Sequence, residues 1–252
     1  MKTAGLDIGS RSVKLVVLRG EEIVHTAIAD TGYDPRGVAK GLLDQAEWDR
    51  VLATGYGRNM AQLHFQAPSV TEIKAHARGV RQSCPGCRTV LDIGGQDTKA
   101  ISLTNGGKVA KFEMNDRCAA GTGKFLEIMA SSLGFSLEDF GTQALQAEGM
   151  QQISSMCTVF AESEVTSAIA KGADRREIAK GLHMSVVRRA AAMLKRVFLT
   201  PVVAFTGGVA RNACLLRMLR EELQMEVVVP DNPDLTGALG AALLAAESDH
   251  RS

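Results

Sequence analysis

A short pattern that occurs twice restricts the folds open to this chain of 252 residues. Each copy has an apolar segment that ends in Asp-Ile-Gly, at residues 7–9 and again at 92–94, followed by a second segment of alternating apolar and polar residues. Alternation on either side of a glycine turn predicts a β-hairpin. Recurrence of the whole unit indicates an internal duplication, and therefore two similar α/β lobes.

The remaining segments alternate between helical and extended patterns. The expected strands outside the two hairpins are 23–28, 51–54, 108–113, 202–205 and 227–229, and the expected helices are 34–46, 71–82, 121–133, 158–171, 176–197, 210–223 and 236–247. We assign residues 1–86 plus 236–252 to lobe I and residues 87–235 to lobe II. The link between the lobes is expected near residues 84–87.

Each hairpin carries the chemistry of a phosphate-binding turn. Glycine lets backbone N–H groups approach an anion, hydroxyl groups add donors, and an aspartate can hold Mg²⁺ through water. One such turn alone is equally well an ordinary β-turn, but two turns facing one cleft favour a bound triphosphate. The candidate catalytic residues are Asp7, Asp92, Gln96 and Asp97, and the candidate cofactor-binding residues are Gly9, Ser10, Arg11, Ser12, Lys14, Gly94 and Gly95.

A third glycine turn follows an apolar strand, at residues 205–212. Gly207 and Gly208 open a helix there, a place where backbone can lie against a nucleoside, and Asn212 completes the candidate set. The chain has no Gly-x-x-x-x-Gly-Lys-Ser/Thr, which excludes a P-loop, and no Gly-x-Gly-x-x-Gly after a strand to support a dinucleotide site.

Composition excludes two classes of partner. A net charge of +1 and an aromatic content of 4% argue against a nucleic-acid binder. We find no signal peptide and no apolar run approaching the roughly 18–20 residues of a membrane helix, so we expect a soluble, cytoplasmic protein with no membrane partner. The chain has five cysteines, an odd number, and no signal peptide. Disulfides are therefore not expected, and metal binding or redox chemistry by the cysteines is expected instead.

In this order the three glycine turns resemble the sugar kinase, Hsp70 and actin superfamily, over nearly the whole chain. The resemblance implies a two-lobed, actin-like ATPase fold of duplicated ribonuclease-H-like lobes, with ATP or ADP and Mg²⁺ in the cleft between them. It implies two paired connecting helices at the hinge, for which 157–170 and 236–246 are the candidates. Glu162 would then orient the attacking water, although a surface ion pair would explain this residue equally well.

Two cysteine motifs narrow the resemblance. Asn115-Asp116-Arg117-Cys118-Ala-Ala-Gly-Thr-Gly and Cys157-Thr-Val-Phe-Ala-Glu-Ser-Glu-Val are similar to segments of the ATP-dependent activators of 2-hydroxyacyl-CoA dehydratases. This group includes the ATPase subunits of benzoyl-CoA reductases. The resemblance implies a homodimer with one [4Fe-4S] cluster bridging two subunits, ligated by Cys118 and Cys157 of each. Further cofactor contacts would come from Gly121, Thr122 and Gly123.

The positions of the two cysteines agree with that implication. Both precede a predicted helix, where N–H groups favour the negative charge of a thiolate cluster. Cys84 and Cys87 stay open between a metal site, a redox disulfide, a share in a four-cysteine site within one chain, and a structural turn. Cys214 is expected to face the core, and His64 and His76 are interpreted as structural.

The expected function is an ATP-driven, one-electron gate. Ferredoxin or flavodoxin would donate the electron, and a dehydratase or reductase component with iron–sulfur clusters would accept it. The accepting system could instead be a benzoyl-CoA reductase or a double-cubane-cluster reductase. Two other classes remain open: a small-molecule kinase of the same fold, which has no use for Cys118 and Cys157, and an ATP-dependent regulator that moves no electron.

Overall fold

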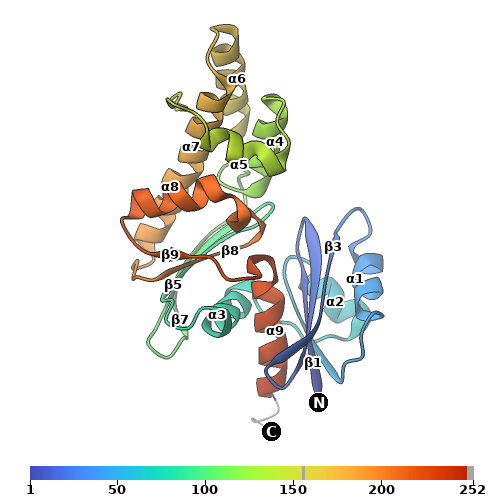
Figure 1. Cartoon of the computed structure of the whole chain (residues 1–252). Helices are drawn as coiled ribbons and strands as arrows, with labels where there is room; N and C mark the ends of the chain where they lie inside the picture. The colour runs from blue at the N-terminus through green and yellow to red at the C-terminus, as the bar shows by residue number, and fades with distance from the viewer. Residues whose placement is uncertain (155–156, 249–252) are drawn as a thin grey trace.

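The computed structural model describes residues 1–154 and 157–248, and these residues form two β-sheets flanked by helices (Figure 1). The first sheet has the strand order β3-β2-β1-β4 and the second the order β7-β6-β5-β8-β9. Their bounds are β1 Lys2–Ile8, β2 Ser12–Arg19, β3 Glu22–Asp30, β4 Arg50–Thr54, β5 Thr89–Ile93, β6 Thr98–Leu103, β7 Val109–Asn115, β8 Val203–Thr206 and β9 Val227–Val228.

The duplication expected from the sequence is visible in the strand pairing. In each sheet the first strand pairs antiparallel with the second and parallel with the fourth. The register is also the same, because Asp7 lies opposite Lys14 and Asp92 lies opposite Lys99. The repeat therefore includes a lysine seven residues after each aspartate.

Helices cover both faces of each sheet. Alternate residues of β2 point to opposite faces, so that Val13 and Leu15 pack with α1 and α2, whereas Val16 and Leu18 pack with α9. On the second sheet, α3 covers one face and α4, α5, α7 and α8 lie in the larger core on the other. The bounds are α1 Pro35–Leu43, α2 Arg58–Phe65, α3 Glu72–Ser83, α4 Gly123–Ser132, α5 Leu137–Leu145, α6 Thr158–Ala170, α7 Arg175–Arg196, α8 Ala213–Leu223 and α9 Thr236–Glu247, with 3-10 turns η1 Gly208–Arg211 and η2 Pro233–Leu235.

The two sheets are joined by close packing of α3 against α9. A Cβ on Gly79 would overlap the carbonyl oxygen of Thr236, and a Cβ on Gly240 would overlap that of Ala75. Glycine at both positions lets the two backbones touch, as small residues do at tight helix crossings. Since α3 covers the second sheet and α9 the first, this contact sets how the sheets sit relative to one another.

This packing corrects the expected pairing of connecting helices. The partner of α9 is α3, not the segment 157–170. That segment forms α6, which packs against α4 and α7 at the opposite end of the molecule from α9 (Figure 1). The sequence analysis also missed α2 and α5, and the helix expected at 210–223 is divided into η1 and α8 at Asn212.

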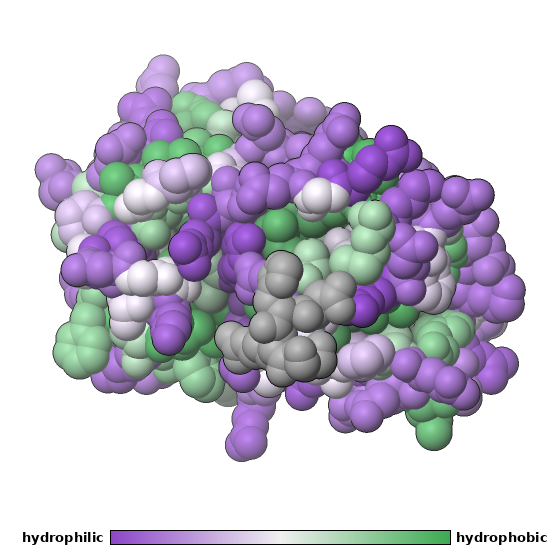
Figure 2. Space-filling view, turned by 90° about the horizontal axis from the view of Figure 1, so that it is seen from below, coloured by the Kyte–Doolittle hydropathy of each residue, from purple (hydrophilic) through white to green (hydrophobic). Residues whose placement is uncertain are grey.

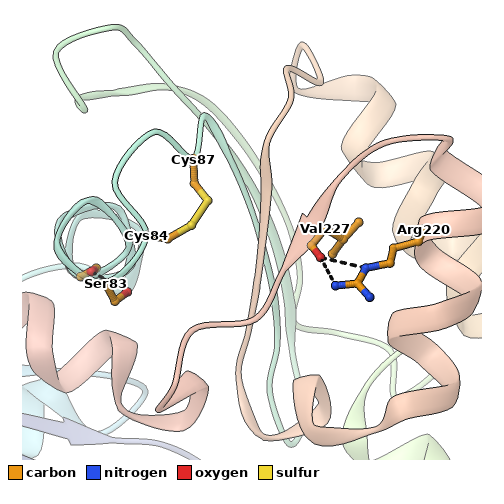
Figure 3. The surroundings of a disulfide bond; sticks show 6 residues. Ser83, Cys84, Cys87, Arg220 and Val227 are labelled. Atoms are coloured by element: carbon orange, nitrogen blue, oxygen red, sulfur yellow. Dashed lines mark hydrogen bonds between the residues drawn. A yellow bond between two sulfur atoms is a disulfide. The ribbon is translucent and has the colours of Figure 1, made fainter.

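Cys84 and Cys87 form a disulfide, so the expectation that the chain has none was wrong (Figure 3). The turn after α3 places them together, because Gly86 adopts a φ of 94° and the N–H of Cys87 donates to the carbonyl of Cys84 at 3.1 Å. Both sulfurs are buried in the core between α3 and the second sheet. Bonded to one another, these residues do not complete a site with Cys118 and Cys157.

The surface of the described residues is mixed. The face seen from below is mostly hydrophilic, with separate hydrophobic groups among the polar side chains (Figure 2). Within residues 1–154 and 157–248, we find no helix with the length and apolar character needed to cross a bilayer.

The substitution Gly240→Ala is expected to destabilise the protein by about 1–3 kcal/mol, because the new methyl group overpacks the contact between α3 and α9. Urea denaturation measures the effect. Gly41→Ala is the matched control, since Gly41 lies on an exposed part of α1 where a Cβ meets nothing within 4 Å. Equal stability of the two variants would contradict the proposed role of this contact.

Candidate active site

The structure brings the two glycine turns face to face. Each turn is closed in the same way, by the N–H of Gly9 donating to Ser12 at 3.1 Å and that of Gly94 donating to Asp97 at 3.0 Å. A Cβ on Gly95 would lie 2.7 Å from Cβ of Arg11. The residues that the sequence assigned to two separate phosphate elements therefore meet at one place.

A cavity of about 390 Å³ opens beside the first turn. Gly9 and Ser10 line it from the first sheet, and Gln96 reaches it from the second turn. Its remaining lining residues come from the first lobe and are Ile8, Thr31, Gly32, Pro35, Tyr56, Gly57 and Met60.

Each turn is flanked by an ion pair between an aspartate before it and a lysine after it; Lys14 is half-buried, whereas Asp7, Asp92 and Lys99 are buried. Nζ of Lys14 lies 3.5 Å from Oδ2 of Asp7, and Nζ of Lys99 lies 3.2 Å from Oδ2 of Asp92. Lys99 also lies 2.8 Å from Asp97 and 2.9 Å from Glu72 of α3, so three carboxylates surround one ammonium group. Lys99 and Glu72 were missed by the sequence analysis, although the repeated Asp-to-Lys spacing would have revealed Lys99.

The burial of these groups controls their protonation. Burial alone would raise the pKa of Asp92, but the charges of His76 and Lys99 and the hydrogen bond from Thr206 outweigh it and lower the pKa to about 2. For Lys99, burial would lower the pKa, and the surrounding carboxylates raise it instead. Burial raises the pKa of Asp97, with Lys99 opposing the change.

The carboxylates present fit a Mg²⁺ ion that is held together with nucleotide phosphates. Mg²⁺ is commonly bound by one or two carboxylates, with water and phosphate oxygens completing the octahedron. Asp7 and Asp92 are the buried carboxylates nearest the two turns, one from each sheet. In the part of the chain that the structure describes, no group of three His, Cys, Asp or Glu side chains is arranged to hold a metal ion.

The third glycine turn lies against the second. The N–H of Gly207 donates to Pro233, and a Cβ on Gly207 would overlap the carbonyl oxygen of Ile93. Arg211 is held by Asp234 through two contacts of 2.6 Å. The turn is therefore rigidly supported by η2 at the start of α9.

The side-chain amide of Asn212 is already hydrogen-bonded within the protein. Its Oδ1 accepts from the N–H of Leu215 at 3.0 Å and caps α8, while its Nδ2 lies 3.0 Å from Nε2 of the buried His183. Burial lowers the pKa of His183 to about 4, which keeps its ring neutral and able to accept this bond. The proposed nucleotide contact through the Asn212 side chain stays a prediction, and the structure supplies a structural role instead.

The segment that carries Cys118 is tied to the second turn. The N–H groups of Gly123 and Lys124, the first residues of α4, donate to the carbonyls of Gly94 and Gly95 at 2.9 and 2.8 Å. The hydroxyl of Thr98 donates to Gly121 at 2.7 Å. Asn115 holds the loop from the other side, donating to the carbonyl of Cys118 at 2.8 Å.

Cys118 and Cys157 occupy different local structures. Cys118 is half-buried and precedes α4 as expected, but it lies in a loop five residues before the helix and not at its first turn. Cys157 is exposed and is the N-cap residue of α6, as expected. Ser155 and Met156, which precede it, lie outside the described residues. Cys214 is buried as expected, and burial raises its pKa to about 11.

Arg11 and Glu127 connect the first turn to α4. Nη1 of Arg11 lies 2.7 Å from Oε2 of Glu127, whose other carboxylate oxygen lies 3.3 Å from Lys124. Arg11 was expected to contact the cofactor, and here it bridges to the helix that follows the Cys118 loop. Glu162, by contrast, is exposed on α6, and its expected role depended on the helix pairing that the structure overturns.

Duplicated sheets with two facing turns and a crossed helix pair define the actin-like, sugar kinase fold of nucleotide-binding proteins. A ROK family glucokinase from Streptomyces griseus shares this fold, with a TM-score of 0.61 at 14% identity over 98% of this chain and 100% of that one. The chain belongs to the BadF/BadG/BcrA/BcrD ATPase family, whose model matches residues 4–245. This confirms the fold, the family and the ATPase class expected from the sequence.

Individual relatives are similar over nearly their full length. The 2-hydroxyisocaproyl-CoA dehydratase activator of Clostridioides difficile is 41% identical over 100% of this chain and 97% of its own. One of the subunits of the benzoyl-CoA reductase of Thauera aromatica is 37% identical over 97% of this chain and 93% of its own.

Two solved structures match closely. Component A of the (R)-2-hydroxyglutaryl-CoA dehydratase of Acidaminococcus fermentans gives a TM-score of 0.94 at 38% identity and covers 100% of both chains. The activator of the 2-hydroxyisocaproyl-CoA dehydratase from Clostridium difficile, with bound ADPNP, gives a TM-score of 0.88 at 40% identity over 100% of this chain and 98% of that one.

Lys99→Met is expected to cost about 3–5 kcal/mol of stability, because it leaves the buried Asp92 and the half-buried Asp97 and Glu72 without their shared cation. The control is Lys40→Met, which removes an exposed pair on α1 worth about 0.3–0.5 kcal/mol. Denaturant unfolding at neutral pH compares the two, and a similar small loss in both would contradict the prediction.

The pH dependence of stability tests the same cluster. Because the folded pKa of Asp92 is depressed to about 2, its contribution to stability is present above about pH 4 and is lost as the pH falls through about 2. Asp92→Asn is therefore expected to flatten the acid limb of the stability curve. An unchanged acid limb would contradict this.

Proposed function

We propose that this chain is an ATP-hydrolysing activator that passes one low-potential electron to a 2-hydroxyacyl-CoA dehydratase or a related reductase. The names of its full-length relatives support the dehydratase as partner. The observation that carries the proposal is the hydrogen-bonded link between the second phosphate turn and the Cys118 loop.

Through that link, nucleotide binding can change the position of the Cys118 thiol. Three hydrogen bonds, from Gly123, Lys124 and Thr98, keep the loop in register with the turn, each worth about 0.5–1.5 kcal/mol. A turn that moves to bind phosphate therefore moves the start of α4 and the loop before it. The Arg11–Glu127 pair adds a contact from the first turn, so that α4 responds to both sides of the cleft.

The free thiols fit a cluster that two copies of the chain share. Cys118 and Cys157 are the accessible free thiols in the described residues, whereas Cys214 is buried and Cys84 is bonded to Cys87. A [4Fe-4S] cluster takes four thiolates, so two per chain imply a homodimer. When bound, the cluster supplies a one-electron carrier.

The electron balance is simple. Ferredoxin or flavodoxin loses one electron, and the iron–sulfur centre of the partner protein gains it. Hydrolysis of ATP to ADP and phosphate supplies the drive. A coupling of about 1–3 kcal/mol between two sites, typical of allosteric proteins, shifts a one-electron potential by roughly 40–130 mV. Docking on the partner would then add a further shift in reduction potential to the one that nucleotide binding produces in this protein.

The similarity to the Thauera aromatica benzoyl-CoA reductase favours an aromatic reductase as the second candidate partner. Reduction of each purified partner by the reduced chain and ATP separates the two. A small-molecule kinase is less well supported, because none of the residues lining the cavity beside the first turn is acidic. An acceptor bound there would have no carboxylate base among those residues.

Anaerobic purification is expected to yield a brown protein with about four irons per dimer. Cys118→Ser should lose the iron and the colour, because the shared cluster loses two of its four ligands. Cys214→Ser is the control, since this thiol is buried in the core. A colourless dimer with native fold after anaerobic reconstitution would overturn the electron-transfer function.

The nucleotide link can be tested without the cluster. In the cluster-free Cys157→Ser chain, a non-hydrolysable ATP analogue with Mg²⁺ is expected to change the alkylation rate of Cys118. Glu127→Gln should reduce this nucleotide effect about two- to fivefold, the factor expected when an exposed pair worth roughly 0.5–1 kcal/mol is lost.

Glu221→Gln is the matched control for Glu127→Gln, because it removes an exposed ion pair on α8. An alkylation rate that ignores the nucleotide in the parent chain would contradict the link itself. A nucleotide effect of equal size in both variants would contradict the part assigned to Arg11 and Glu127.

A further inference from the structure

We propose that His76 is a positioning residue of the ATPase site, which orients Asp92 and sets its place relative to Asp7. The sequence analysis interpreted this histidine as structural. The structure places it on α3 with 7% of its surface exposed, next to Asp92 near the end of β5. The proposal rests on the proposed role of these aspartates in holding the metal of the nucleotide.

One nitrogen of the imidazole approaches the carboxylate of Asp92, and the other borders a space that Asp7 also borders. Nδ1 lies 3.4 Å from Oδ1 of Asp92. On the other side, a Cβ built on Gly237 would lie 3.2 Å from Nε2 of His76 and 2.9 Å from Oδ2 of Asp7, so both atoms border the same small space at the start of α9. Glycine at 237 keeps this space clear of a side chain.

The contact with Asp92 completes the set of groups around that carboxylate. Thr206 donates to Oδ1 at 2.9 Å, and Lys99 lies on the Oδ2 side at 3.2 Å. Nδ1 of His76 is buried and makes no hydrogen bond within the described residues, and its ion-pair contact there is the 3.4 Å approach to Asp92. A carboxylate only accepts hydrogen bonds, so this approach is favourable in the tautomer that has its proton on Nδ1.

The position of His76 also connects the site to the joint between the sheets. It lies one residue after Ala75 and three before Gly79, the positions at which α3 touches the backbone of α9. Asp92 belongs to the second sheet and Asp7 to the first. A change in the packing of α3 on α9 therefore changes the distance of this imidazole from Asp7, and with it the alignment of the two carboxylates.

Groups that orient metal-binding carboxylates have a recognisable energetic effect. Their loss lowers metal affinity or activity about 10- to 100-fold. His76→Ala is therefore expected to lower kcat for MgATP by about that factor, with little change in KM. It should also remove most of the gain in ADP affinity that Mg²⁺ provides, while ADP affinity in EDTA stays that of the parent chain.

Two conservative variants show which nitrogen acts. The asparagine amide nitrogen reaches about as far from the backbone as Nδ1, and the glutamine amide nitrogen about as far as Nε2. Because the close contact is through Nδ1, His76→Asn is expected to recover activity and the Mg²⁺ effect better than His76→Gln. His64→Asn and His64→Gln are matched controls, since His64 is exposed on α2.

The outcomes divide clearly. His76 variants that match the His64 controls would overturn the inference. So would equal losses in His76→Ala, His76→Asn and His76→Gln accompanied by a lower melting temperature, because these would indicate a role in folding alone. Asp92→Asn is the reference: if it keeps full activity and the full Mg²⁺ effect, the proposed metal role of Asp92 is wrong. If only Asp92→Asn is impaired, that role stands and the inference about His76 fails.

Discussion

The contact between α3 and α9 is the constraint on which the rest of the structure depends. Each helix covers one face of a different sheet, and their backbones touch at Gly79 and Gly240. A larger residue at either position would separate the helices and move the two sheets apart. The facing of the two glycine turns and the Arg11–Glu127 pair both require the sheets to be held at this separation.

The duplicated hairpins place a similar Asp–Lys pair on each side of the cleft, but the total charge around the two pairs differs. Each first strand carries near its end a buried aspartate that faces a lysine, but the second copy adds Asp97 and Glu72 around the same ammonium group. Even with Arg58 4.0 Å from Glu72, these three carboxylates leave an excess of negative charge around the buried Asp92, which is costly without further cations. An additional cation is therefore most favourable beside the second sheet. The first sheet, where Lys14 faces a single aspartate, is better suited to phosphate.

Local patterns explain what could be predicted from the sequence. The hairpins, the glycine turns and the cysteine motifs are short-range features, and they led to the fold, the family and most of the candidate site. The pairing of α9 with α3 is a long-range property: the sequence 158–170 is as rich in small apolar residues as 72–83 is, and only tertiary packing shows which helix lies against Gly240. Glu162 was chosen because 157–170 was interpreted as the connecting helix; for the same reason Glu72 was overlooked and His76 was interpreted as structural.

The rule that a cysteine before a helix lies at its N-terminal N–H groups holds for Cys157 and not for Cys118. Cys157 is the N-cap residue of α6, whereas the first N–H groups of α4 are already committed to Gly94 and Gly95. Cys118 therefore gains little from a helix terminus and is positioned instead by Asn115 and the second turn. Its loop is coupled by hydrogen bonds to the second turn, the proposed phosphate-binding element. Cys157, on a helix that packs against α4 and α7, follows the same movement indirectly. A cluster held by both thiols would thus experience the nucleotide state chiefly through Cys118, with α6 as the more independent support.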